Sequence, residues 1–383
     1  MKIINYGRQY IDKEDIKYVG KALKSEKITQ GKFVSIFEKN LSKYMGAKYC
    51  ASVSSGTSAL FLSLKTLNLK KKNTVITTPL TFASTVTSVL MNNYKVDFCD
   101  INSKSYTLDL NKLETKLKKN KKIGAVIAVD YAGHPSDWKD LKYLKNKYNF
   151  FLINDNCHAL GAKYNNDKSY AVRYADLVTQ SFHPVKNITT GEGGAILSNN
   201  KIFYEKIVSL RSHSMIRNKI LSNKYGRWHY EINEVGYNFR LSDIQCALGI
   251  SQLKKINLFL NKRKKVAKIY DKAFSNTSFF TIPKIQKKIL HSYHLYPLLI
   301  DFKKKKINKK RFFKQMFDKK INLQVHYIPV HTQPFMRKYG FKPGNYPVAE
   351  NFFNMEVSLP IYYTIKNSEI RYVIKNIKKV IGD

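Results

Sequence analysis

Between about residues 44 and 198 the chain alternates short runs rich in β-branched and apolar residues with helical stretches. Strands are expected at residues 49–53, 75–78, 96–99, 125–129, 150–154, 177–182 and 195–197, and helices at 60–67, 84–91, 110–117 and 138–147. Strands that alternate with helices form a mostly parallel sheet whose two faces are covered by those helices. The pattern therefore predicts an α/β fold in which ligands bind beyond the carboxyl ends of the strands.

A smaller α/β unit is expected to follow a long helix that begins near Ser242. The segment Ser242-Asp243-Ile244-Gln245 has the spacing of a capping box, and apolar residues then recur at helical intervals. Beyond a turn-rich stretch at 276–288, strands are expected at 294–300 and 323–327, and helices at 309–319 and 370–381. The chain is thus expected to divide into a large domain, 1–250, and a part comprising the linking helix and a small C-terminal domain, 251–383.

The formal net charge of +41, from 68 Lys and Arg against 27 Asp and Glu, would suit a nucleic-acid binding protein. Such a protein should carry its basic residues on one face and bind with a steep dependence on salt. Here the lysines are dispersed through the expected helices and loops, so most of them are expected to be solvated. We therefore expect no nucleic-acid partner, and expect the charge at most to attract an anionic substrate.

No apolar run reaches membrane-spanning length, and the first residues lack the apolar core of a signal peptide. The cysteines Cys50, Cys99, Cys157 and Cys246 lie far apart and form no Cys-x-x-Cys pair. They are expected to be reduced thiols, and neither a disulfide framework nor a metal site. The expectation is a cytoplasmic protein without a membrane partner and without a metal.

One lysine, Lys186, stands in the connection between the expected strands 177–182 and 195–197. The segment 181–194 holds a proline, several hydroxyl residues and glycines, which favour an irregular loop over a helix. A lysine amine that is partly desolvated at a strand end has a lowered pKa and can attack a carbonyl. Because most lysines in so basic a chain are solvated surface charges, Lys186 needs partners to be a catalytic residue.

Two other segments supply such partners. Asp155 directly follows an apolar strand, which places its carboxylate at a carboxyl end, although an Asx turn would explain it equally well. Gly56 and Thr57 lie between a strand and a helix, where backbone N–H groups bind anions, although the segment is also an ordinary N-cap. An amine, a carboxylate for a ring nitrogen and a phosphate cradle are what pyridoxal 5'-phosphate requires. Phe82 would stack on such a ring, unless it is a core residue.

The segments 54–60, 155–161, 181–194 and 236–241 together resemble the DegT/DnrJ/EryC1/StrS family of nucleotide-sugar aminotransferases. The resemblance extends over essentially the whole chain. It implies the aspartate aminotransferase fold, which is fold type I of the pyridoxal phosphate enzymes, with a mostly parallel seven-stranded sheet in the large domain and a smaller C-terminal α/β domain.

The resemblance also implies roles for individual residues. Lys186 would bond covalently to the cofactor and move the proton, and Asp155 would pair with the pyridine nitrogen. The remaining cofactor contacts would come from His158 at the ring hydroxyl, where many members have Gln, and from Gly56, Thr57 and Ser181 at the phosphate. Asn238 lies in a loop that reaches the neighbouring active site in similar enzymes, which implies a homodimer. Asn154 departs from the family, where an acid is common at that position, and Asn156 with Cys157 replaces a small pair.

Within the family, the chain is most similar to the branch that acts on a UDP-linked 4-keto-6-deoxy amino sugar in pseudaminic acid synthesis. The likeness implies that L-glutamate is the amino donor and that the sugar-nucleotide site is lined by Tyr6, Lys27, Thr29, His326 and Tyr327. The alternatives are amination of another dTDP-, UDP- or GDP-linked keto-sugar at C4 or C3, a cofactor-dependent sugar dehydratase, or a regulatory relative. Lys186 argues against the dehydratases, in which histidine replaces this lysine.

Overall fold

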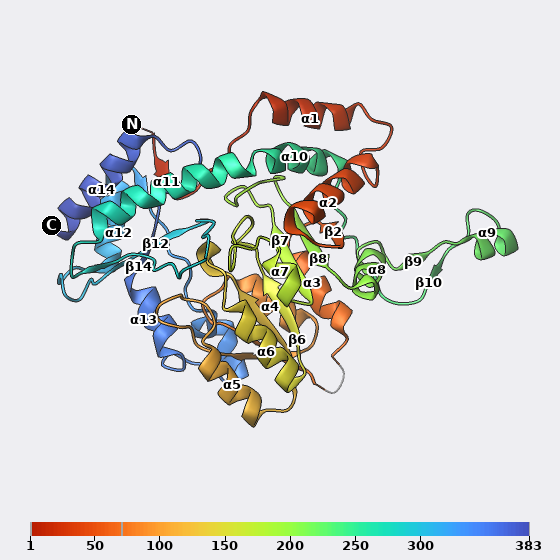
Figure 1. Ribbon diagram of the computed structural model, residues 1–383, viewed down its shortest axis with the longest axis horizontal. Helices are drawn as coiled ribbons and strands as arrows, with labels where there is room; N and C mark the ends of the chain where they lie inside the picture. Colours follow the sequence, from red (N-terminus) through yellow and green to blue (C-terminus); the bar gives the residue numbers. More distant parts are fainter. Residues whose placement is uncertain (1, 70–71, 383) are drawn as a thin grey trace.

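The computed structural model describes residues 2–69 and 72–382, and its centre is a seven-stranded sheet of order β2-β8-β7-β6-β5-β3-β4 (Figure 1). These strands are β2 (Tyr49–Val53), β3 (Thr74–Thr77), β4 (Lys95–Phe98), β5 (Ile123–Val129), β6 (Phe151–Asp155), β7 (Leu177–Ser181) and β8 (Gly194–Ser198). All neighbours pair in parallel except β8, which is antiparallel to both β2 and β7. The mostly parallel α/β fold expected from the sequence is confirmed.

Helices cover both faces of this sheet because alternate strand residues point to opposite sides. On β5, Val126 and Ala128 pack into one apolar cluster, whereas Ala125 and Ile127 pack into another. The first face is covered mainly by α2 (Lys32–Met45), α5 (Leu110–Lys119), α6 (Trp138–Tyr148), α7 (Tyr170–Tyr174) and α10 (Asp243–Lys254). The second is covered mainly by α3 (Gly56–Leu67), α4 (Ala83–Met91) and α8 (Lys201–Leu210). Helix α1 (Lys13–Leu23) packs outside α10.

The C-terminal part forms a second apolar core around a three-stranded antiparallel sheet, β11-β12-β14. Its elements are α11 (Ile256–Phe274), β11 (Phe280–Thr281), β12 (Tyr296–Ile300), α12 (Lys309–Asp318), β13 (Ile321–Asn322), α13 (Pro347–Met355), β14 (Glu356–Leu359) and α14 (Asn367–Ile381), with short 3₁₀ helices η1 (Tyr131–Gly133), η2 (Val330–Thr332) and η3 (Pro334–Tyr339) nearby. β1 (Ile4–Asn5) pairs with β13, and Ile4 joins this core. The N-terminal segment therefore packs with the C-terminal part, and the division at residue 250 remains a prediction.

Two expectations for the C-terminal half are wrong in detail. The helix expected from Ser242 is two helices, α10 and α11, which meet at Lys255, whose φ of −97° and ψ of 0° interrupt the regular helix. The strand expected at 323–327 is absent from the described chain, because pairing ends at Asn322 and continues only as an isolated bridge between Gln324 and Ser358. Residues 324–327 instead line a cavity.

An arm projects from the body of the molecule and carries β9 (Met215–Ile216), α9 (Lys219–Tyr225) and β10 (Glu231–Ile232) (Figure 1). β9 and β10 form an antiparallel pair, and both are exposed. Within residues 2–69 and 72–382, no helix combines the length and the apolar character needed to cross a membrane.

Asp243 links two helices of the large domain. It is fully buried at the start of α10, where Oδ2 accepts the N–H of Gly31 at 2.7 Å and Oδ1 accepts the N–H of Phe33 at 2.9 Å. Its carboxylate therefore caps the N-terminus of α2, whose own N-cap residue, Gly31, has no side chain to do so.

Asp243→Ala is expected to lower the free energy of unfolding by about 1–3 kcal/mol, because two buried N–H groups lose their acceptor. Urea denaturation measures the change. Glu205→Ala is the control, because Glu205 is exposed and only forms a 3.6 Å pair with Lys201, so its loss should cost less than about 1 kcal/mol. Equal destabilisation by the two substitutions would contradict the capping role.

Candidate active site

A cavity of about 640 Å³ lies beyond the carboxyl ends of β6 and β7, where a mostly parallel sheet is expected to bind its ligand. Its lining includes the last residues of those strands, Asp155 and Ser181, together with Gly56 and Thr57 at the start of α3. The loop that holds Lys186 and residues 324–328 of the C-terminal part close it from other sides. The cavity thus lies between the two cores of the molecule.

Lys186 lies on this cavity and is half-buried. The ends of its loop are held together by the pairing of Ser181 with Gly194, and Asn187 donates from Nδ2 to the carbonyl of Leu160 at 2.9 Å. Removal of water lowers the pKa of the Lys186 amine, while the nearby Asp155 and Cys157 oppose that shift. A lowered pKa leaves more of the amine neutral at a given pH, and the neutral amine is the nucleophile.

Asp155 is buried at the end of β6 with both carboxylate oxygens bonded. Thr85 donates from Oγ1 to Oδ2 at 2.8 Å, and the N–H of Cys157 donates to Oδ1 at 3.3 Å. The Thr85 hydroxyl is itself 2.7 Å from that of Thr81. These contacts hold a carboxylate at the cavity wall, where it can pair with a positively charged group of a ligand.

The start of α3 forms an anion cradle. Ser55 caps the helix by accepting the N–H of Ser58 at 3.0 Å, and the first turn at Gly56 and Thr57 faces the cavity. A Cβ on Gly56 would lie 2.9 Å from the Cβ of Ser181, closer than real side chains approach. Glycine therefore lets Ser181 come close to a helix N-terminus, where free N–H groups favour an anion.

His158 has a defined tautomer in this site. Its Nδ1 accepts the N–H of Ala132 at 3.3 Å, so the ring proton is on Nε2, which lies 3.0 Å from the hydroxyl of Tyr327. Burial, with a contribution from Lys186, places the pKa of His158 well below its usual range. His158 is therefore a neutral ring that presents an N–H donor on the cavity side.

Phe82, Tyr6 and His326 complete the aromatic wall. Phe82 is 58% exposed and its ring centroid lies 5.8 Å from that of Tyr327, so it is a cavity residue and not a core residue. The rings of Tyr6 and His326 are 4.9 Å apart. Three of the residues expected at the sugar-nucleotide site, Tyr6, His326 and Tyr327, are thus brought together.

The other expected site residues lie outside this cavity. Lys27, Thr29 and Asn238 are exposed and are not among its lining residues in the described chain. Asn238 forms an isolated bridge with Ser212 at the base of the arm. Contacts of these three with an active site remain predictions.

A buried network behind Asp155 was missed by sequence reasoning. Asp130 accepts hydrogen bonds from the N–H of Ser136, the indole of Trp138, the hydroxyl of Tyr170 and the side-chain amides of Asn154 and Asn156. Burial raises the pKa of Asp130 to about 6, and these donors oppose the shift. The network explains the two unusual asparagines, because an acid at 154 would replace a donor by a second carboxylate. The only signal in the sequence was that departure itself.

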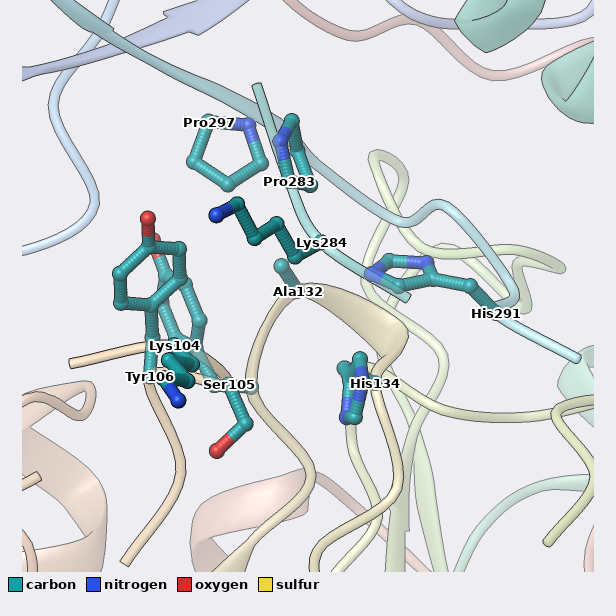
Figure 2. Close-up of a pocket in the computed structure, with 10 residues that line it drawn as sticks. Lys104, Ser105, Tyr106, Ala132, His134, Pro283, Lys284, His291 and Pro297 are labelled. Carbon is teal, nitrogen blue, oxygen red and sulfur yellow. The ribbon is translucent and has the colours of Figure 1, made fainter. Parts of the chain in front are cut away.

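A second cavity, which Figure 2 shows in close-up, is much smaller. It lies between residues 104–106, the segment that holds Ala132 and His134, and the segment from Pro283 to Pro297. Its volume is about 10 Å³, which holds at most one water molecule. It is therefore a packing gap between the two cores and not a substrate site.

The residues of the large cavity fit pyridoxal phosphate. Lys186 offers an amine of lowered pKa, Asp155 a carboxylate, and Gly56, Thr57 and Ser181 a cradle that a Cβ at position 56 would fill. His158 offers an N–H donor for a ring oxygen.

Comparisons with known proteins show the family to which the chain belongs. The sequence profile of the DegT/DnrJ/EryC1/StrS aminotransferase family matches residues 9–378. The UDP-4-amino-4,6-dideoxy-N-acetyl-beta-L-altrosamine transaminase of Campylobacter jejuni is 41% identical over 97% of this chain and 96% of its own. Helicobacter pylori PseC, described as an aminotransferase of pseudoaminic acid biosynthesis, superposes with a TM-score of 0.91 at 32% identity over the full length of both chains. A Streptococcus pneumoniae chain solved in its PLP form is 26% identical, with a TM-score of 0.90 over 99% of both chains.

Gly56→Ala is expected to weaken retention of pyridoxal phosphate by about tenfold, because the added methyl group overpacks the contact with Ser181. The cofactor that remains after dialysis, measured by its absorbance, reports the effect. Gly20→Ala is the control, since the space around Gly20 in α1 is open among the described residues. Unchanged retention in the Gly56 variant would contradict the cradle.

Proposed function

The chain belongs to the DegT/DnrJ/EryC1/StrS family and is a pyridoxal phosphate-dependent sugar aminotransferase, and we propose that it transfers the amino group of L-glutamate to C4 of a UDP-linked 4-keto-6-deoxy-N-acetyl-hexosamine. The proposed reaction belongs to pseudaminic acid biosynthesis. The observation that carries the proposal is Lys186, which holds a lowered-pKa amine in a large cavity beside Asp155. The Campylobacter jejuni relative and a Helicobacter pylori relative that is 33% identical are both UDP-4-amino-4,6-dideoxy-N-acetyl-beta-L-altrosamine transaminases, which supports the choice of substrate.

Pyridoxal phosphate, when bound, supplies an electron sink for the electrons of a breaking C–H bond. Lys186 contributes the neutral amine that attacks a carbonyl, and afterwards a base that takes a proton from one carbon and returns it to another. The Asp155 carboxylate favours a proton on the pyridine nitrogen, and Thr85 keeps that carboxylate in place. Because one lysine serves both amino donor and amino acceptor, the two substrates would react in turn at the same site.

The proposed substrate matches the charge of the chain and of the site. A UDP-sugar carries a diphosphate, which a formal charge of +41 attracts over long distances. The aromatic wall of Tyr6, Phe82 and Tyr327 offers apolar surface to a sugar ring. We further propose a cytoplasmic enzyme, because its four cysteines are free thiols, which are typical of a reducing compartment.

We propose that the active enzyme is a homodimer in which Asn238 enters the partner's site. The arm that precedes Asn238 exposes Ile220, Trp228 and Val235 to 78%, 75% and 72%, more apolar surface than a lone chain usually leaves in water. Lys27 and Thr29 are also exposed, and the Ile28 carbonyl between them accepts the N–H of Asp243. A second copy of the chain would cover these residues.

Purified protein with pyridoxal phosphate and L-glutamate is expected to aminate a UDP-linked 4-keto-6-deoxy-N-acetyl-hexosamine in preference to dTDP- or GDP-linked keto-sugars. Product mass and NMR identify the aminated carbon, which separates C4 from C3 amination. Lys186→Ala should reduce turnover by at least about 10³-fold, because its amine acts in both half-reactions. Bound cofactor without amination of any keto-sugar would instead support a regulatory relative.

Subunits that carry Lys186→Ala and subunits that carry Asn238→Ala are expected to complement each other. Each variant alone should be strongly impaired, whereas a mixed dimer regains one site with both native residues, giving roughly a quarter of native activity in a random mixture. Co-expression with two affinity tags yields the mixed dimer for assay. If Asn238 acted in its own subunit's site, the mixture would be no more active than the variants alone.

A further inference from the structure

A chain of hydrogen bonds runs from His326 on the cavity wall to a carboxyl group that does not reach the cavity. His326 Nδ1 lies 2.8 Å from Oγ of Ser358, and that oxygen lies 2.5 Å from Oε1 of Glu356. The other carboxyl oxygen, Oε2, accepts the backbone N–H of His326 at 3.0 Å. Glu356 and Ser358 are fully buried on β14 and are not among the lining residues of the cavity.

The free end of this chain of hydrogen bonds lies at the cavity. His326 lines the cavity, and its Nε2 has no hydrogen-bond partner among the described residues, whereas its Nδ1 is engaged by Ser358. Burial and the Lys186 amine lower the pKa of His326 to about 3, so the ring stays neutral. A neutral imidazole carries one proton, and the bond made by Nδ1 decides which nitrogen holds it.

The direction of the hydrogen bonds depends on the proton of Glu356. When Glu356 is ionised, Ser358 must donate to it and can only accept from Nδ1–H, which leaves a lone pair on Nε2. When Oε1 carries a proton, it donates to Ser358, whose own hydrogen then turns to Nδ1 and leaves the ring proton on Nε2. The contact of Oε2 with the backbone N–H is the same in both states.

We propose that Glu356, acting through Ser358, is a positioning residue that sets whether Nε2 of His326 donates or accepts a hydrogen bond in the substrate cavity. The donor form binds an oxygen that can only accept, such as a carbonyl or phosphate oxygen. The acceptor form repels it. The protonation state of Glu356 on β14 therefore determines which form is present, although Glu356 does not line the cavity.

The groups around Glu356 allow its carboxyl group to gain or lose a proton near neutral pH. Burial raises its pKa, and the ammonium of Lys309, which donates to the carbonyl of Phe353, opposes that shift while its own pKa is lowered by burial. Tyr131 and Tyr327 also interact electrostatically with Glu356, and Lys186, His158 and His294 do so with His326. Burial holds the pKa of both tyrosines well above the usual value, so they stay neutral. Rising pH thus removes the proton of Glu356 and converts Nε2 from donor to acceptor.

The first test needs no substrate. Histidine labelled with ¹⁵N in the cofactor-loaded protein reports the tautomer of each ring by chemical shift, and the resonances lost in His326→Gln assign this ring among the nine histidines. In the native protein, the chemical shift of His326 Nε2 should change from that of a protonated ring nitrogen to that of an unprotonated one as pH rises. The chemical shift of Nδ1 should change in the opposite sense. In Glu356→Gln the amide oxygen still accepts the backbone N–H and the amide NH₂ donates to Ser358, so Nε2 should hold the proton at every pH.

Ser358→Ala and Glu350→Gln complete the design. Ser358→Ala removes the hydroxyl that connects Glu356 to His326. The His326 tautomer should therefore no longer change with pH as it does in the native protein. Glu350→Gln is the matched control, because Glu350 contacts another buried histidine, His331, at 2.9 Å outside the cavity lining. It should leave the pH response of His326 unchanged. Two results would overturn the proposal. One is a His326 tautomer in the native protein that matches the tautomer in Glu356→Gln at every pH. The other is a His326 tautomer in Ser358→Ala that changes with pH as it does in the native protein.

A kinetic test rests on the proposed function. The KM for the keto-sugar nucleotide should rise roughly fivefold in the native enzyme as pH passes the NMR transition, as expected for the loss of one hydrogen bond. In Glu356→Gln this rise should be absent, and the KM should keep its low-pH value at every pH. If the KM of the native enzyme did not depend on pH although the NMR transition was present, only the role of His326 in substrate binding would be overturned. Failure of the amination assay with the NMR transition intact would instead overturn the proposed function.

Discussion

The electrostatic interaction of the half-buried Lys186 amine with the buried Asp155 carboxylate is the one around which the rest of the site is arranged. Desolvation makes the Lys186 amine a better nucleophile, but it would also make an isolated cation costly, and Asp155 offsets part of that cost. The pair can form only because β6, β7 and β8 are adjacent in the sheet, with Asp155 opposite Thr179 and Ser181 opposite Gly194. Strand pairing therefore determines the electrostatics of the cavity.

Buried acids organise a chain whose surface is overwhelmingly basic. Asp130 gathers donors from β6 and α6 behind Asp155, Asp243 caps α2 from α10, and Glu356 supports His326 from β14. Each acid is held by N–H or hydroxyl donors more than by lysines, so its position does not depend on mobile surface charges. Some lysines do pair with other carboxylates, as Lys145 does with Asp176 and Lys255 with Asp15.

Much of the fold could be predicted from the sequence because the large domain follows local rules. The alternation of strands and helices predicted the sheet, and β2 coincides with its expected bounds while the other strands shift only at their ends. The error at 323–327 arose because an apolar, β-rich run is equally suited to a strand and to a cavity wall. The roles proposed for Lys27, Thr29 and Asn238 would need contacts from a second subunit, and the order of residues in one chain does not determine such contacts.

The sequence by itself determined the class of chemistry. It shows a lysine in a glycine-rich loop, an aspartate at a strand end and a helix start with small residues. Each of these patterns can be recognised from residues that are adjacent in the chain. Only the tertiary structure decided the environment of each group. The tautomer of His158, the donors around Asp130 and the path from Glu356 to His326 depend on hydrogen bonds between residues up to 40 positions apart. Hydrogen-bond direction and desolvation depend on such contacts across folded segments, and no local pattern in the sequence specifies them.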